Sequence, residues 1–215
     1  MDLADDTAWT HYNSALATYS FVMIGVECKT LSRAGQNPGG PRPLRSKALP
    51  AGLPSHTLTQ SEKDDLNTAN YFITQCVRLA WRCLSLDIGF AIENPEPWDP
   101  EAPSLWDLNN VAELCADTRV SIVDFDQCMW GSDSRKPTRI AYFKVDLSSL
   151  SRRCNHKPHW LNVTNYKGHT KKVWGPHPPL IRQKQDGQFA TKAAAAYPAH
   201  LNIQLAEQIY RSVPF

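Results

Sequence analysis

A chain of 215 residues with 42% hydrophobic side chains is long enough and apolar enough to bury a core, which excludes a protein that is disordered throughout. It has no run of eighteen apolar residues, and residues 1–6 lack the basic-then-apolar order of a signal peptide, so we expect no membrane span and a nuclear or cytoplasmic location. The formal net charge is only +2, and the six scattered cysteines are typical of free thiols in a reducing compartment.

The first sixty residues predict a helix, a strand and a long loop. Residues 1–18 carry apolar side chains at helical spacing, and residues 19–26 form an apolar run typical of a buried strand. Residues 33–60 are rich in Pro and Gly and far exceed an ordinary connection in length. Such a segment is typical of a functional or disordered loop.

A long helix and a second strand follow. Thr59 or Ser61 can cap an amphipathic helix that ends near residue 86. The next strand begins at Gly89 and ends at Pro95, which has no backbone N–H to continue a ladder. This strand–helix–strand order predicts two parallel strands joined by a right-handed crossover.

The remaining elements complete an α/β fold. Residues 105–116 predict a helix, and residues 120–125 and 139–145 predict two strands that form an antiparallel edge pair. We therefore expect residues 1–150 to form a partial Rossmann-like sheet with helices. Residues 151–215 are expected to add a basic, loop-rich region and a helix over residues 197–213 that packs on this core.

Polar side chains end both predicted parallel strands. Cys28 follows the first strand, and Glu93 and Asn94 end the second. Ligands of open α/β sheets bind at the carboxyl ends of the strands. We therefore expect these three side chains to belong to one site.

Three segments, in this order, resemble motifs of the cytosine-5 DNA methyltransferases. The family's Pro-Cys-x-x-Phe-Ser nucleophile motif is similar to Glu27-Cys28-Lys29-Thr30-Leu31-Ser32, and its Glu-Asn motif is similar to Ile92-Glu93-Asn94-Pro95. Its later aromatic-Gly turn and arginine pair are similar to residues 126–131 and 135–140, in the Lys-Pro-Thr-Arg variant of phage and mobile-element relatives. The resemblance spans residues 19–145 and implies a partial methyltransferase sheet.

The resemblance also implies a role for each residue. The Cys28 thiolate would add to a cytosine ring carbon, and Glu93 would hydrogen-bond the ring nitrogen. Arg135 or Arg139 would neutralise the developing charge. Asn94 would hold Glu93 in position.

Two departures from the family bear on activity. Glu27 replaces the family's Pro, and its charge would raise the pKa of Cys28. S-adenosylmethionine is implied by the resemblance only, because the chain has no Gly-x-Gly loop to hold it. We expect no binding of this cofactor by the isolated chain, so a second chain or domain would supply the pocket.

The sequence leaves two alternative functions open. The protein is either an incomplete or degenerate methyltransferase, or a non-catalytic nucleic-acid-binding remnant of a mobile element.

Basic residues are concentrated in two segments without acids. Residues 33–60 contain four bases and residues 147–185 contain eight, and neither segment contains Asp or Glu. Such segregation indicates a polyanion partner, here DNA as a duplex with an extruded base or as a single strand, although solvated loops are the alternative. The candidate nucleic-acid-binding residues are Arg33, Arg42, Arg45, Lys47, Lys167, Lys171 and Lys172.

A zinc-stabilised binding module is the rival hypothesis. Cys128, Cys154, His156 and His159 offer thiolate and imidazole ligands. The paired Cys-x-x-Cys of common zinc sites is missing, so the sequence alone favours no metal.

Overall fold

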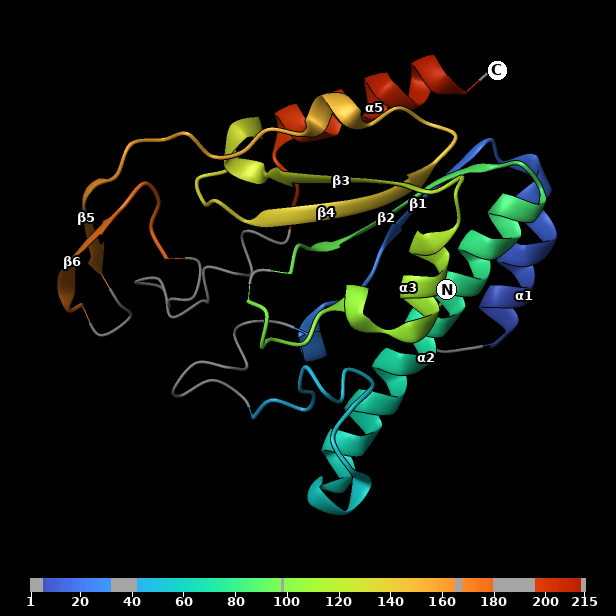
Figure 1. Cartoon of the computed structure of the whole chain (residues 1–215), viewed down its shortest axis with the longest axis horizontal. Helices are drawn as coiled ribbons and strands as arrows, with labels where there is room; N and C mark the ends of the chain where they lie inside the picture. The colour runs from blue at the N-terminus through green and yellow to red at the C-terminus, as the bar shows by residue number, and fades with distance from the viewer. Residues whose placement is uncertain (1–5, 32–41, 98, 165–167, 180–195, 214–215) are drawn as a thin grey trace.

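A four-stranded mixed sheet with the strand order β1-β2-β4-β3 lies at the centre of the computed structural model, which describes residues 6–31, 42–97, 99–164, 168–179 and 196–213 (Figure 1). Parallel strands β1 and β2 pair at one side, and antiparallel strands β4 and β3 complete the sheet. The strand bounds are β1 Phe21–Gly25, β2 Gly89–Pro95, β3 Ser121–Asp126 and β4 Pro137–Phe143. The predicted parallel crossover and antiparallel pair are both confirmed.

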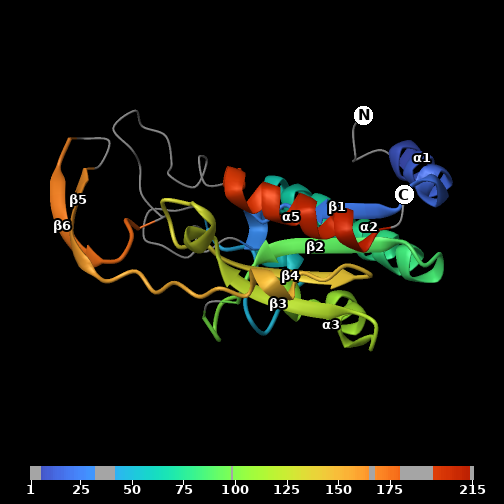
Figure 2. The same ribbon diagram turned by 90° about the horizontal axis from the view of Figure 1, so that it is seen from above.

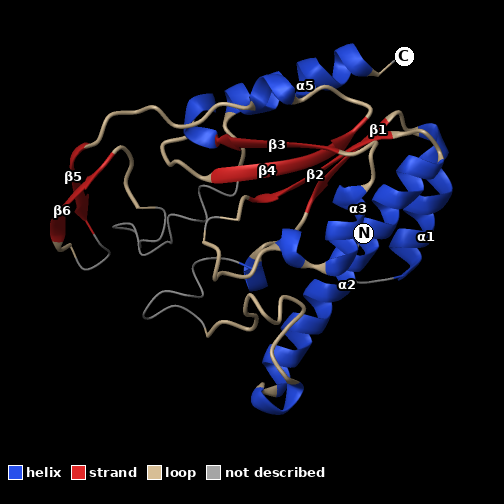
Figure 3. Ribbon diagram, in the orientation of Figure 1, coloured by secondary structure: helices blue, strands red, loops and turns tan. Residues whose placement is uncertain are grey.

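Helices cover both faces of this sheet. Helices α1, α2 and α3 lie on one face and α5 lies on the other, so the main body has three layers (Figures 2 and 3). The helix bounds are α1 Asp6–Ala15, α2 Gln60–Ser85, α3 Asn109–Ala116 and α5 Ala199–Ser212. Short 3-10 turns are η1 Leu16–Thr18, η2 Lys29–Leu31, η4 Ser55–Thr57, η5 Leu105–Asp107, η6 Gln127–Trp130 and η7 Ser148–Leu150. Within the described ranges, no helix combines the length and hydrophobicity that crossing a membrane requires.

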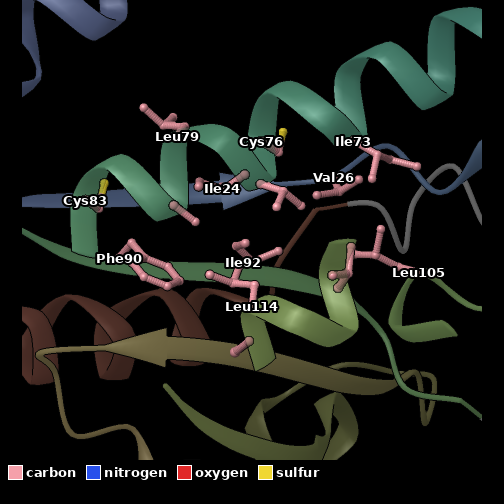
Figure 4. Close-up of a cluster of buried hydrophobic side chains, with 14 of the residues drawn as sticks. Ile24, Val26, Ile73, Cys76, Leu79, Cys83, Phe90, Ile92, Leu105 and Leu114 are labelled. Atoms are coloured by element: carbon pink, nitrogen blue, oxygen red, sulfur yellow. The ribbon is translucent and has the colours of Figure 1, made fainter. Parts of the chain in front are cut away.

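Strand β2 contributes to an apolar core on each face of the sheet. Phe90 and Ile92 point toward α2 and α3, where they pack with side chains such as Ile73 (Figure 4). Ala91 points the other way, into a cluster that includes Leu201 of α5. This alternation follows from the two-residue period of a strand, and burial on both faces explains the unbroken apolar sequence of β2.

The described part of the Pro/Gly-rich loop packs along α2. The Asn70 side chain in α2 donates a hydrogen bond of 2.8 Å to the carbonyl oxygen of Ala51. Gly52 has a φ of +138°, and a Cβ there would lie 2.2 Å from the buried Leu66 side chain. Glycine is therefore required where this loop approaches the helix.

A second, two-stranded sheet was not expected from the sequence. Strands β5 (His159–Thr164) and β6 (Thr170–Gly175) pair antiparallel and stand apart from the main sheet, at the end of the molecule far from α1 (Figure 1). The expectation of loops over residues 151–196 is therefore wrong for this β5–β6 hairpin. The only signal was a short alternation of polar and apolar residues in β5, which basic and aromatic neighbours obscure.

The structure selects Thr59 as the N-cap of α2. The Thr59 hydroxyl accepts a hydrogen bond from the Glu62 amide, and the Glu62 carboxylate accepts one from the Thr59 amide. Thr59→Ala should therefore lower the free energy of unfolding by about 1 kcal/mol. Ser61→Ala, at the exposed second residue of the helix, should change it by less than about 0.5 kcal/mol. Urea denaturation followed by circular dichroism measures both, and equal losses would contradict the assignment of the cap.

Candidate functional site

The carboxyl ends of β1 and β2 bring Cys28 and Glu93 together. The two strands are parallel neighbours, and Gly25 is in register with Glu93. Beyond β1, the Val26 amide still donates to the Glu93 carbonyl oxygen at 3.4 Å, so the chain stays beside β2 as it approaches Cys28. A bond of 2.9 Å from the Leu31 amide to the Cys28 carbonyl oxygen then turns the chain into η2. Cys28 and Glu93 therefore lie at the same end of adjacent parallel strands, as expected.

Asn94 fastens the two strand ends to each other. Its side chain is 2% exposed, and its amide nitrogen donates a hydrogen bond of 3.0 Å to the Val26 carbonyl oxygen. The Trp106 indole donates to the Pro95 carbonyl oxygen at 2.9 Å, which holds the last residue of β2. Asn94 thus ties the backbone just before Cys28 to the backbone just after Glu93.

Glu93 is a buried carboxyl group with unused hydrogen-bonding capacity. It lies opposite Ile140 in β4 and therefore points to the α5 face of the sheet. It is 8% exposed, and its Oε1 atom has no hydrogen-bond partner among the described residues. Burial raises the pKa of Glu93, while the charge of Lys136 and a hydrogen bond from the Tyr197 hydroxyl lower it by less. The group therefore keeps its proton to a higher pH than an exposed glutamate does.

Lys136 supplies the positive charge of this site. Burial raises the pKa of the Cys28 thiol, the charge of Glu93 raises it further, and Lys136 lowers it. Glu27, the residue suspected from the sequence, makes the smallest contribution to that rise. The Lys136 Nζ atom lies 5.6 Å from the centre of the Tyr197 ring. We refer to Cys28, Glu93, Lys136 and Tyr197 as the Cys28–Glu93 cluster.

The two arginines implied by the resemblance are engaged elsewhere. Arg139 lies opposite Asn94, so it points to the α2/α3 face, away from Glu93. There it forms two hydrogen bonds, of 2.7 and 2.8 Å, with the Asp124 carboxylate. The Arg135 Nε atom lies 3.0 Å from the buried Asp126 carboxylate. The positive charge that the resemblance assigned to an arginine is supplied at Cys28 and Glu93 by Lys136 instead.

The three described bases of the first basic segment, Arg42, Arg45 and Lys47, are buried or paired with acids. Arg45 is 2% exposed and donates hydrogen bonds to the Thr30 hydroxyl and the Pro50 carbonyl oxygen, and burial lowers its pKa to about 10. Arg42 pairs with Glu62, and Lys47 pairs with Asp107 at 2.5 Å. The expectation that Arg45 binds nucleic acid at the surface is therefore wrong, because its side chain anchors the loop.

Two of the four remaining candidate nucleic-acid-binding residues lie on the β5–β6 hairpin. These are Lys171 and Lys172, whereas Arg33 and Lys167 lie outside the described residues. Lys172 shares one face with Trp160 and Trp174, whereas Lys171 points to the opposite face with Val163. The two indoles are 64% and 58% exposed and their ring centres are 5.3 Å apart. This face, which we call the tryptophan face, combines exposed aromatic surface with positive charge.

The cysteine and histidine residues of the rival hypothesis are only partly brought together. Cys128, Cys154 and His156 lie close to one another, and His177 joins them. His159 begins β5, and its Nδ1 atom lies 3.3 Å from the Lys157 carbonyl oxygen. His177 therefore takes the position that the sequence assigned to His159.

Comparisons with protein-family models, with curated proteins and with solved structures give no match to this chain.

The Cys28–Glu93 cluster combines a thiol, a buried carboxyl group, an ammonium group and a phenol. Sequence reasoning found the thiol and the carboxyl group. It missed Lys136, although this residue stands between the two arginines of a motif, and Tyr197, which no pattern marked.

The electrostatics predict how fast Cys28 reacts with iodoacetamide. Glu93→Gln removes a charge that raises the pKa of Cys28, so the thiolate should form at lower pH and alkylation at pH 8 should be several-fold faster. Lys136→Gln should slow alkylation, and Glu27→Gln should change it least. Mass spectrometry of the peptide that contains Cys28 gives the rate as a function of pH. Rates that shift in the same direction for Glu93→Gln and Lys136→Gln would contradict the assigned cluster.

Proposed function

We propose that this protein binds DNA and holds one unpaired base at the Cys28–Glu93 cluster, as a methyltransferase-like protein. The proposal is supported above all by Glu93, whose buried Oε1 atom has no hydrogen-bond partner within the described part of the chain and lies at the same strand ends as the Cys28 thiol. A buried polar atom without a partner is costly, and a ligand that bonds to it recovers that cost. The parallel β1–β2 pair beside the antiparallel β4–β3 pair resembles part of a Rossmann-like methyltransferase sheet.

The chemistry of the cluster suits a pyrimidine ring. A protonated Glu93 can donate a hydrogen bond to a ring nitrogen, and its raised pKa extends the protonated form to higher pH than in an exposed glutamate. Base-modifying enzymes take such a base out of the stack, because their groups cannot reach it inside a duplex. A cytosine fits this arrangement, since its ring nitrogen is an acceptor.

Binding is better supported than methyl transfer. The raised pKa of Cys28 leaves little thiolate at neutral pH, and the thiolate is the form that attacks a ring carbon. The methyl donor of the resembling family, S-adenosylmethionine, would require a pocket for which this sequence has no Gly-x-Gly loop. The non-catalytic alternative is therefore the one that we favour for this chain.

The tryptophan face is the proposed contact surface for the rest of the nucleic acid. Exposed aromatic rings stack on unpaired bases, and a nearby lysine can neutralise phosphate. Trp160, Trp174 and Lys172 meet both requirements on one face of the hairpin.

Charge reversal on the two faces of the hairpin tests this surface. Lys172→Glu should weaken binding to single-stranded oligonucleotides and reduce the salt slope by about one, and Lys171→Glu should have the smaller effect. Trp160→Ala should cost about 1–3 kcal/mol of binding free energy if it stacks on a base. Fluorescence anisotropy at several salt concentrations measures all three. Equal effects of the two lysine variants, or a wild-type affinity that does not depend on salt, would count against the tryptophan face.

A second experiment isolates base recognition. Wild-type protein should bind a duplex with a mismatched cytosine more tightly than one with an abasic site at that position, and this preference should fall as pH rises, because Glu93 then loses its proton. Glu93→Leu keeps similar volume, and should abolish the preference while leaving affinity for the abasic duplex nearly unchanged. Glu27→Leu, an exposed neighbour of Cys28, is the matched control. A preference that survives in Glu93→Leu would remove Glu93 from the proposal.

A further inference from the structure

We infer that Cys128, Cys154, His156 and His177 form a structural zinc site. One ligand atom from each of these residues can be chosen so that all four lie within 4.8 Å of one another. The Cys154 Sγ atom lies 3.5 Å from His156 Nδ1 and 3.4 Å from His177 Nε2. A tetrahedral zinc ion with ordinary Zn–S and Zn–N bond lengths separates sulfur and nitrogen ligands by about 3.6 Å. The arrangement of these side chains therefore has the dimensions of a Cys₂His₂ site.

Neighbouring groups hold the candidate ligands in a suitable orientation. The His177 Nδ1 atom lies 3.1 Å from the Asp133 carbonyl oxygen, so a proton on Nδ1 leaves Nε2 free as a ligand. The Cys154 amide donates a hydrogen bond of 2.7 Å to the buried Asp126 carboxylate. These contacts are typical of the second shell of a metal centre, in which ligands are fixed by their other hydrogen bonds.

The set of ligands indicates a structural role for the ion. Two thiolates and two imidazoles complete a tetrahedron and leave no position for water or substrate, whereas catalytic zinc keeps one position open. The six cysteines are all described and all free, so no disulfide occupies Cys128 or Cys154. The soft thiolates favour zinc over magnesium or calcium.

The position of the site in the chain shows what the ion would stabilise. Cys128 lies in η6, directly after β3 of the main sheet. Cys154 and His156 precede β5, and His177 follows β6, so they hold both ends of the β5–β6 hairpin. One ion would thus fasten the hairpin to the main sheet. The Gln127 amide, next to Cys128, donates to the Lys136 carbonyl oxygen at 3.3 Å, which places this junction beside the Cys28–Glu93 cluster.

The metal content of the full-length chain tests the inference directly. Wild-type protein should retain about one zinc ion per chain, measured by inductively coupled plasma mass spectrometry. His177→Ala and Cys154→Ser should lose the ion, and His159→Ala, which removes the nearby histidine outside the cluster, should keep it. Cobalt added to metal-free wild-type protein should give thiolate charge-transfer absorption and the visible bands of a tetrahedral ion. Because this measurement uses the unaltered chain, it remains decisive if a ligand variant does not fold.

Three results would overturn the zinc site. These are wild-type protein that binds neither zinc nor cobalt, a disulfide between Cys128 and Cys154 found by mass spectrometry of the purified protein, and loss of zinc in His159→Ala with retention in His177→Ala.

The role of the ion at the tryptophan face rests on the proposed function and is measured separately. Chelation of zinc should lower the affinity of wild-type protein for single-stranded DNA, because the hairpin is no longer held, and restored zinc should recover it. Stoichiometric zinc without any DNA binding would support the metal site and refute the proposed function. DNA binding that chelation leaves unchanged would refute the role of the ion in holding the hairpin.

Discussion

The ladder of backbone hydrogen bonds on both sides of β2 determines where Glu93, Asn94 and Arg139 lie. This strand is bonded to β1 in the parallel direction and to β4 in the antiparallel direction, and it is buried on both faces. Its register sets Glu93 beside the end of β1 and opposite Ile140. Because successive side chains point to opposite faces, the same register that aims Glu93 at α5 aims Asn94 and Arg139 at α2 and α3.

Local patterns were sufficient for the strands of the main sheet and for two of the four side chains in the Cys28–Glu93 cluster, but not for the β5–β6 hairpin. The apolar runs predicted β1 and β2, and the order of elements predicted that Cys28 and Glu93 share an edge. Lys136 and Tyr197 were missed because they reach the cluster only through tertiary packing, from a turn before β4 and from the approach to α5. His177 was missed for the same reason, since it comes beside Cys154 only after the β5–β6 hairpin has formed.

The charges that surround a basic segment in the sequence differ from those that surround it on the folded surface. The bases of residues 33–60 have no acid near them in the chain, yet folding places Glu62 beside Arg42 and Asp107 beside Lys47. These pairs are partly exposed and contribute little to stability, but they reduce the positive potential of the loop. An acid-free stretch therefore indicates a polyanion surface only where the fold brings no acids to it.

The Oε1 atom of Glu93, which has no hydrogen-bond partner among the residues that the structure describes, links folding to recognition. A buried polar atom without a hydrogen bond costs the native state about 1–3 kcal/mol, and the free protein carries that cost until a ligand bonds to the atom. Any occupant that bonds to it should therefore also raise the melting temperature, since binding to the native state alone shifts the unfolding equilibrium. Selection for a more stable protein would tend to replace this carboxyl group by an apolar side chain. Its retention in evolution would therefore indicate that it binds a ligand rather than that it stabilises the fold.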